Sequence, residues 1–93
     1  MKEKDIEKKL TAKVKALGGM AIKFTSPGMD GMPDRLVLLP GGRIVFVELK
    51  APGEKMRPLQ LWRAKQLLAL GFKAYCVDSI DQIGGILDEI QST

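Results

Sequence analysis

The sequence predicts a small α/β domain, an α/β sandwich in which helices flank one β-sheet. Stretches with apolar residues at three- and four-residue spacing are typical of amphipathic helices, and short, almost wholly apolar runs are typical of strands. The chain has 93 residues, the size of one domain. The expected order is αβββαβα: a helix at 2–17, strands at 20–24, 35–39 and 43–50, a helix at 58–70, a strand at 73–77 and a last helix that begins near 79–81.

The first two expected helices have identifiable ends. In the first, Ile6, Leu10 and Val14 recur at four-residue spacing, which places them on one face. Gly18 follows and ends this helix, because glycine adopts the left-handed capping conformation without strain. Pro58 suits the first turn of the second helix, where its missing N–H leaves no hydrogen bond unmade.

The two central strands are expected to form a hairpin. They flank Pro40-Gly41-Gly42, a typical turn sequence, and a turn-rich loop at 26–33 precedes them. Both strands are apolar at nearly every position, whereas a half-exposed strand alternates apolar with polar residues. We therefore expect a sheet that is covered on both faces.

The composition excludes several kinds of active site. The chain contains no histidine. This excludes Ser-His-Asp triads, Cys-His nucleophiles, histidine-based phosphodiesterases and nearly every catalytic zinc site. Hydrolytic chemistry here would have to use carboxylates, lysine and a metal ion that prefers oxygen ligands.

Charge and cysteine content bear on the partner and the location of the protein. The net charge is +4, which favours such a partner only weakly because many small domains carry this charge for solubility. The single cysteine cannot form an internal disulfide, which predicts a reducing cytoplasm, including that of a phage-infected host. No apolar stretch is long enough to span a bilayer, so we expect no membrane partner.

Three ionisable residues stand at the ends of the central strands. Glu48 and Lys50 are two residues apart on one strand, so their side chains emerge on the same face. Asp34 joins them only if the hairpin loop has three residues, because paired residue numbers then sum to 82 and Asp34 lies opposite Glu48. A two-residue loop would place Asp34 on the other face unless a bulge restored the register.

Two carboxylates held close together favour a bound cation. They repel each other, and one would take up a proton unless a divalent ion neutralised them; oxygen ligands of this kind suit Mg²⁺ or Mn²⁺. Such a metal activates water and binds a phosphoryl oxygen, and Lys50 beside it would orient that water or neutralise charge on the phosphate. The alternative is that Asp34 with Arg35, and Glu48 with Lys50, form ordinary surface ion pairs.

The same residues resemble a known nuclease signature. Pro33-Asp34, followed after thirteen residues by Glu48-Leu49-Lys50, is similar to the PD-(D/E)XK motif, and Gly31-x-Pro33-Asp34-Arg35 with Gln60 downstream resembles the VRR-NUC family in its stand-alone phage form. The similarity extends from the first helix to the last. It implies one nuclease domain over 1–93 with a restriction-endonuclease-like αβββαβα fold and a central mixed sheet.

The resemblance also implies roles for individual residues. Asp34 and Glu48 match the metal-binding acids, and the backbone carbonyl of Leu49 matches a further ligand. Lys50 matches the catalytic lysine. Glu7 matches the acid of the first helix, near the metal directly or through water.

Gln60 matches a helix residue that reaches the site. Taken alone, it would be a surface residue between two leucines, and Glu7 would be a solvated helix residue or the partner of Lys8 or Lys13.

Basic side chains are the candidate contacts to a nucleic-acid backbone. They would grip phosphates without reading sequence, whereas the low aromatic content of 5% argues against base stacking as the main mode. Trp62 is expected in the core and Cys76 is expected to be buried. The candidate phosphate contacts are Lys23, Arg35, Lys55 and Arg57, with Arg43, Arg63 and Lys65 in addition.

Three hypotheses follow for function. The first is a Mg²⁺- or Mn²⁺-dependent endonuclease, and the resemblance implies that it is a homodimer acting on branched DNA such as Holliday junctions. The second is a non-catalytic nucleic-acid-binding scaffold with the same fold, which the presence of Asp34, Glu48 and Lys50 together argues against. The third is an α/β interaction domain whose acids pair with neighbouring lysines.

Overall fold

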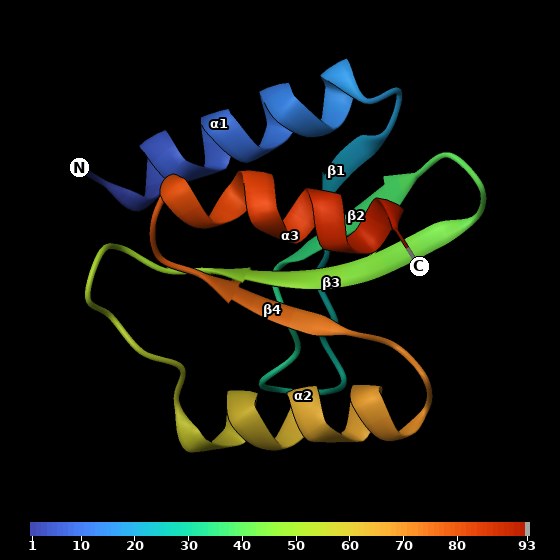
Figure 1. Ribbon diagram of the computed structural model, residues 1–93. Helices are drawn as coiled ribbons and strands as arrows, with labels where there is room; N and C mark the ends of the chain where they lie inside the picture. The colour runs from blue at the N-terminus through green and yellow to red at the C-terminus, as the bar shows by residue number, and fades with distance from the viewer. Residues whose placement is uncertain (93) are drawn as a thin grey trace.

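The computed structural model describes residues 1–92, and every expected element is present within about one residue of its expected bounds (Figure 1). None of the helices in this part of the chain is long and apolar enough to cross a membrane. The elements are α1 (Glu3–Ala16), β1 (Met20–Lys23), β2 (Arg35–Leu39), β3 (Arg43–Leu49), α2 (Pro58–Ala69), β4 (Ala74–Val77) and α3 (Asp81–Gln91).

The four strands form one mixed sheet in the order β1-β2-β3-β4. β1, β2 and β3 are antiparallel neighbours, whereas β4 runs parallel to β3 because α2 carries the chain back between them. α1 and α3 lie side by side on one face of the sheet, and α2 lies on the other side (Figure 1). The mixed α/β sandwich expected from the sequence is confirmed.

The core lies between the sheet and the pair α1 and α3. The odd-numbered residues of β2 and β3 point toward this pair, and Val37 and Val47 among them are each 1% exposed. Ile6 of α1 and Ile83 of α3 meet them and are fully buried. Burial of each such side chain is worth roughly 1.5–3 kcal/mol, so this layer supplies most of the apolar stabilisation.

The opposite face of the sheet is only partly covered, which differs from the expectation of two covered faces. α2 packs mainly against β4 and buries only Gln60 and Leu67 among its own residues. Ile22 of β1 and Ile44 of β3 therefore remain 38% and 43% exposed. The strand pattern does encode two apolar faces, but one helix is too small to cover both ends of the second face.

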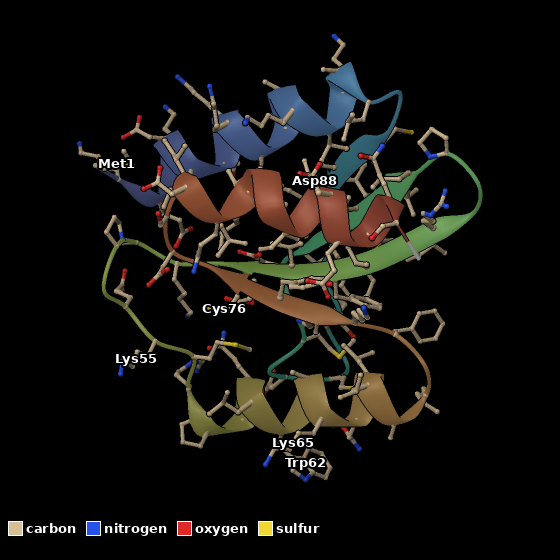
Figure 2. All side chains as sticks on the ribbon, in the orientation of Figure 1. Met1, Lys55, Trp62, Lys65, Cys76 and Asp88 are labelled. Carbon is tan, nitrogen blue, oxygen red and sulfur yellow. The ribbon has the colours of Figure 1, made fainter. Side chains whose placement is uncertain are left out.

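The prediction that Trp62 belongs to the core is wrong. Its side chain points away from the sheet on the outer surface of α2 and is 52% exposed (Figure 2). Gln60 and Leu67 define the inward face of this helix, and a residue two positions after Gln60 is rotated by about 200° from it. The Arg63 guanidinium lies 5.1 Å from the Trp62 ring centroid instead. Cys76, expected to be buried, is half-buried.

The hairpin has the register that brings the acids together. Leu39 pairs with Arg43, so Pro40-Gly41-Gly42 forms a three-residue loop and paired numbers sum to 82. Gly41 and Gly42 have φ values of 88° and 74°, which residues with a side chain rarely adopt. At the other end of the ladder Arg35 pairs with Val47, so the next pair of positions is Asp34 and Glu48.

Candidate active site

Asp34 is fixed by backbone contacts on both sides. It directly precedes β2, and its carbonyl accepts a hydrogen bond of 2.9 Å from the N–H of Phe24 at the end of β1. Its carboxylate Oδ1 accepts a hydrogen bond of 3.2 Å from the N–H of Leu49 in β3. These bonds hold the carboxylate over the end of the β2–β3 ladder.

Glu48 is the most deeply buried acid of the described chain, at 5% exposed. Its Oε2 accepts a hydrogen bond of 3.1 Å from Gln60 Nε2 and lies 3.5 Å from Lys50 Nζ. Its Oε1 is buried, and no group of the described chain donates a hydrogen bond to it. A buried carboxylate oxygen without a donor is unfavourable, so this atom is suited to a cation that the protein does not itself supply.

The electrostatics at Asp34 also favour a cation. Burial and then the nearby Glu48 carboxylate raise the pKa of Asp34 from 3.8 to about 6, against the lowering effect of the hydrogen bond from the Leu49 N–H. Two acids that repel each other at a partly buried position form a better site for a divalent ion than for two protons. The residues present therefore fit a hard metal ion with oxygen ligands.

The main chain of β3 directs one carbonyl toward the β2 side of the strand. The N–H of Lys50 donates to the Val77 carbonyl at 2.9 Å, on the β4 side of the strand. Main-chain groups of successive residues in a strand point to opposite sides, so the carbonyl of Leu49 faces the same side as its N–H, toward Asp34. Glu48, Leu49 and Lys50 thus present a carboxylate, a carbonyl and an ammonium at one strand end.

Gln60 links α2 to the acids. It lies in the first turn of this helix and is 5% exposed. While its amide N–H group donates to Glu48, its Oε1 accepts a hydrogen bond of 2.8 Å from the Arg57 N–H, which would otherwise be unpaired at the helix start. One side chain therefore both begins the helix and orients the acid.

Glu7 reaches the site through another residue. Its carboxylate forms an ion pair with the Arg35 guanidinium, and Arg35 Nη1 donates to the Asp34 carbonyl at 3.1 Å. Arg35 is only 7% exposed, so the structure places this expected phosphate contact inside the protein. Among residues 1–92, no three acidic or cysteine side chains lie close enough together to hold a metal ion by themselves.

Sequence reasoning missed one acid near the site. Glu3 raises the pKa of Asp34 through its charge, so it faces the same end of the sheet. It lies four residues before Glu7, and this i, i+4 spacing on α1 was the available signal.

A hollow of about 310 Å³ opens beside Asp34, bounded by the loop between β1 and β2. The loop is anchored on α2 by a hydrogen bond of 2.8 Å from Arg63 Nε to the Asp30 carbonyl. Gly31 has a φ of 84°, and a Cβ there would lie 2.7 Å from Leu59 Cγ, so only glycine fits between loop and helix. The hollow gives access to Asp34 from solvent.

Exposed basic side chains surround this end of the molecule. Lys23 is on β1, next to Arg35 across the sheet, and is exposed. Lys55 and Arg57 are exposed on the connection between β3 and α2, where Lys55 projects outward (Figure 2). Unlike Arg35, all three can reach a ligand in solvent.

Known proteins are similar to this chain over most of its length. No protein-family model matches. The protein called "Putative nuclease p44" of Acyrthosiphon pisum secondary endosymbiont phage 1 is 53% identical over 81 residues, which cover 87% of each chain. A solved structure described as "VRR_NUC domain" superposes with a TM-score of 0.85 at 33% identity and covers 92% of this chain and 94% of its own. The chain belongs to the VRR-NUC family of nucleases, with the restriction-endonuclease-like α/β fold.

Proposed function

We propose that the protein is a metal-dependent endonuclease that hydrolyses phosphodiester bonds in DNA. The observation that carries this proposal is the buried Glu48 Oε1, which has no donor within the described chain and belongs to an acid whose charge acts on the Asp34 carboxyl. A site that needs a cation, next to a lysine and a solvent-open hollow, suits hydrolysis of an anionic substrate.

We assign roles to the residues of the site on this basis. Asp34, Glu48 and the Leu49 carbonyl would hold Mg²⁺ or Mn²⁺, which supplies a water of lowered pKa and neutralises phosphate charge. Lys50 would orient the attacking water or stabilise charge on the phosphate, and its contact with Glu48 keeps its ammonium at the site. Gln60 would orient Glu48.

We further propose branched DNA, such as a four-way junction, as the substrate. Lys23, Lys55 and Arg57 would contact phosphates and give salt-sensitive affinity without sequence readout. A domain of this size has room for one such site, so cleavage of two strands requires a second copy. The similarity to a phage protein supports action of this single domain, 1–93, in the cytoplasm of a bacterial host.

The partly covered sheet face supports a homodimer. Met20 and Ile44 occupy one row of this face on either side of Leu38, and they are 60% and 43% exposed. Phe46 of the next row packs edge-to-face on Phe24 and Phe72, with ring centroids 5.8 and 6.1 Å apart. Apart from Glu48, which is 5% exposed and bonded to Gln60 of α2, the positions of β1 to β3 on this face carry no charge, which suits an apolar partner rather than a phosphate backbone.

A second copy of the same surface would supply that partner. It would cover the second face of the sheet, which the apolar pattern of the strands predicts to be buried. The contact would be isologous, about a twofold axis. We expect Ile44→Lys to shift the protein from dimer to monomer in light scattering coupled to size exclusion. Leu61→Lys, at a similarly exposed leucine of α2, is the matched control and leaves the mass unchanged. A monomeric wild-type protein would refute the dimer.

The nuclease proposal is tested by cleavage of a labelled four-way junction beside linear duplex and single strand. We expect cutting of the junction with Mg²⁺ or Mn²⁺, none with EDTA, and loss of cutting in Glu48→Ala and Lys50→Ala. Junction binding without cutting would support the non-catalytic scaffold instead. Equal cutting by Glu48→Ala and the wild type would refute the assigned site.

A further inference from the structure

Arg35 is a buried cation between α1 and the beginning of β2. The residue is 7% exposed, and its side chain lies on the face of the sheet that α1 and α3 cover. Its position in the register is opposite Val47, which is 1% exposed. A charged group in such a place is stable only when nearby groups satisfy it.

Two groups of the candidate site satisfy this guanidinium. Nη2 forms an ion pair with the Glu7 carboxylate of α1, and Nη1 donates to the Asp34 carbonyl at 3.1 Å. Arginine is suited to this arrangement because its planar fork holds two acceptors in a fixed relation, which the single ammonium of lysine does not. Arg35 therefore connects the acid of the first helix to the acid that precedes β2.

We propose that Arg35 is a positioning residue that holds Glu7 and Asp34 in the geometry required for metal binding, and that it does not contact DNA. The inference rests on the proposed function. It differs from the sequence expectation, in which Arg35 is a phosphate contact. Asp34 depends on this support because its other anchors come from the neighbouring strands alone, through Phe24 and Leu49.

Removal of the guanidinium is expected to loosen both acids. In Arg35→Met the side-chain volume is largely kept, but Glu7 and the Asp34 carbonyl lose their shared donor. Residues that orient metal ligands from behind typically change metal affinity by about 10- to 100-fold. We expect calorimetric titration of Mn²⁺ into the free protein to show about tenfold weaker binding in Arg35→Met, with a smaller loss in Arg35→Lys, which keeps the charge.

DNA binding in EDTA separates positioning from phosphate contact. A residue that neutralises one phosphate contributes about one unit to the slope of log affinity against log salt. We expect Lys55→Ala to reduce this slope by about one unit and Arg35→Met to leave it unchanged. A reduced slope in Arg35→Met with unchanged Mn²⁺ affinity would overturn the inference.

A purely structural role gives a different result. Arg35→Lys and Arg35→Met would then lower the melting temperature but bind Mn²⁺ as the wild type does, which would also overturn the inference. The double variant Glu7→Gln/Arg35→Met should bind Mn²⁺ no more weakly than the single variant with the lower Mn²⁺ affinity, because both changes remove the same contact. A wild-type protein that binds no Mn²⁺ would refute the proposed function itself, whereas variants equal to a metal-binding wild type refute only the role of Arg35.

Discussion

The two faces of the sheet are organised on different physical principles. The face under α1 and α3 is closed and mostly apolar, with Ile6 and Ile83 fully buried and one ion pair, Arg35 with Glu7, at the beginning of β2. The face toward α2 carries the polar site, where Glu48 and Gln60 are buried but depend on a few hydrogen bonds. One face therefore holds the fold together, which lets the other keep a carboxylate oxygen without a donor.

The largest expected difference between the faces is in stability. Ile83→Ala should lower the free energy of unfolding by about 2–5 kcal/mol, because it leaves a cavity in the closed core. Ile44→Ala, on the 43% exposed position of the open face, should lower it by less than about 1 kcal/mol for the protomer. Urea unfolding of both variants measures the difference, and equal losses would contradict it.

On the α2 face, one polar side chain should matter more for metal binding than for stability. Gln60→Leu keeps the volume but removes the donor to Glu48 Oε2 and the acceptor of the Arg57 N–H, and we expect about 10- to 100-fold weaker Mn²⁺ binding. Gln66→Leu, at an exposed position of the same helix, is the control and should bind Mn²⁺ normally. Normal Mn²⁺ affinity in Gln60→Leu would show that Glu48 needs no support from α2.

The raised pKa of Asp34 predicts an unusual dependence on pH. Because burial and Glu48 raise this pKa from 3.8 to about 6, the folded protein binds more protons than the unfolded chain between these values. Without metal, the stabilisation from Asp34 is present below about pH 4 and is lost as the pH rises through about 6.

Melting temperatures in EDTA from pH 4 to 7.5 test this sign. In Asp34→Asn the loss of stability that this carboxyl causes as the pH rises should be absent. The variant should therefore be more stable than the wild type at pH 7.5. Mn²⁺ affinity of the wild type should rise by up to about tenfold per pH unit below pH 6 and level off above it, because the ion competes with one proton. A variant with the wild-type pH profile would mean that Asp34 has an ordinary environment.

The smallest effect is expected on the outer surface of α2. Trp62 is 52% exposed and contacts the Arg63 guanidinium, so Trp62→Ala should change the free energy of unfolding by no more than about 1 kcal/mol. A loss of several kcal/mol in chemical denaturation would indicate that this side chain is buried in solution, against another copy of the chain or another partner.

Much of the architecture was predictable because it depends on local chemistry. Glycine at Gly18 and proline at Pro58 act within their own turns, so the ends of the helices could be read directly. Counting the residues of the turn left two possible hairpin registers. The three-residue loop of the structure is the one that places Asp34 opposite Glu48. The family could be recognised because its motif residues lie in short stretches.

The errors and omissions share another cause. Trp62 was misplaced because the inward face of α2 is determined by Gln60, a polar residue whose burial depends on its contact with Glu48 twelve positions earlier. Arg35 could not be distinguished from a surface cation, because its partner Glu7 lies 28 positions away in the sequence. Propensity and periodicity do not report such contacts between distant residues.

Three features follow from the amino-acid sequence alone: the order of the elements, the absence of histidine chemistry and the residues that stand at the strand ends. The burial of charged groups and the contacts that they make depend instead on how the elements pack together. The physical reason is that a charge buried at the end of a strand is stabilised by groups that the fold brings from other elements: Arg35 for Glu7, and Gln60 for Glu48. The spacing of residues along the chain determines which of them share a face of a helix or strand. The solvation and the electrostatic environment of a side chain depend on which faces pack together.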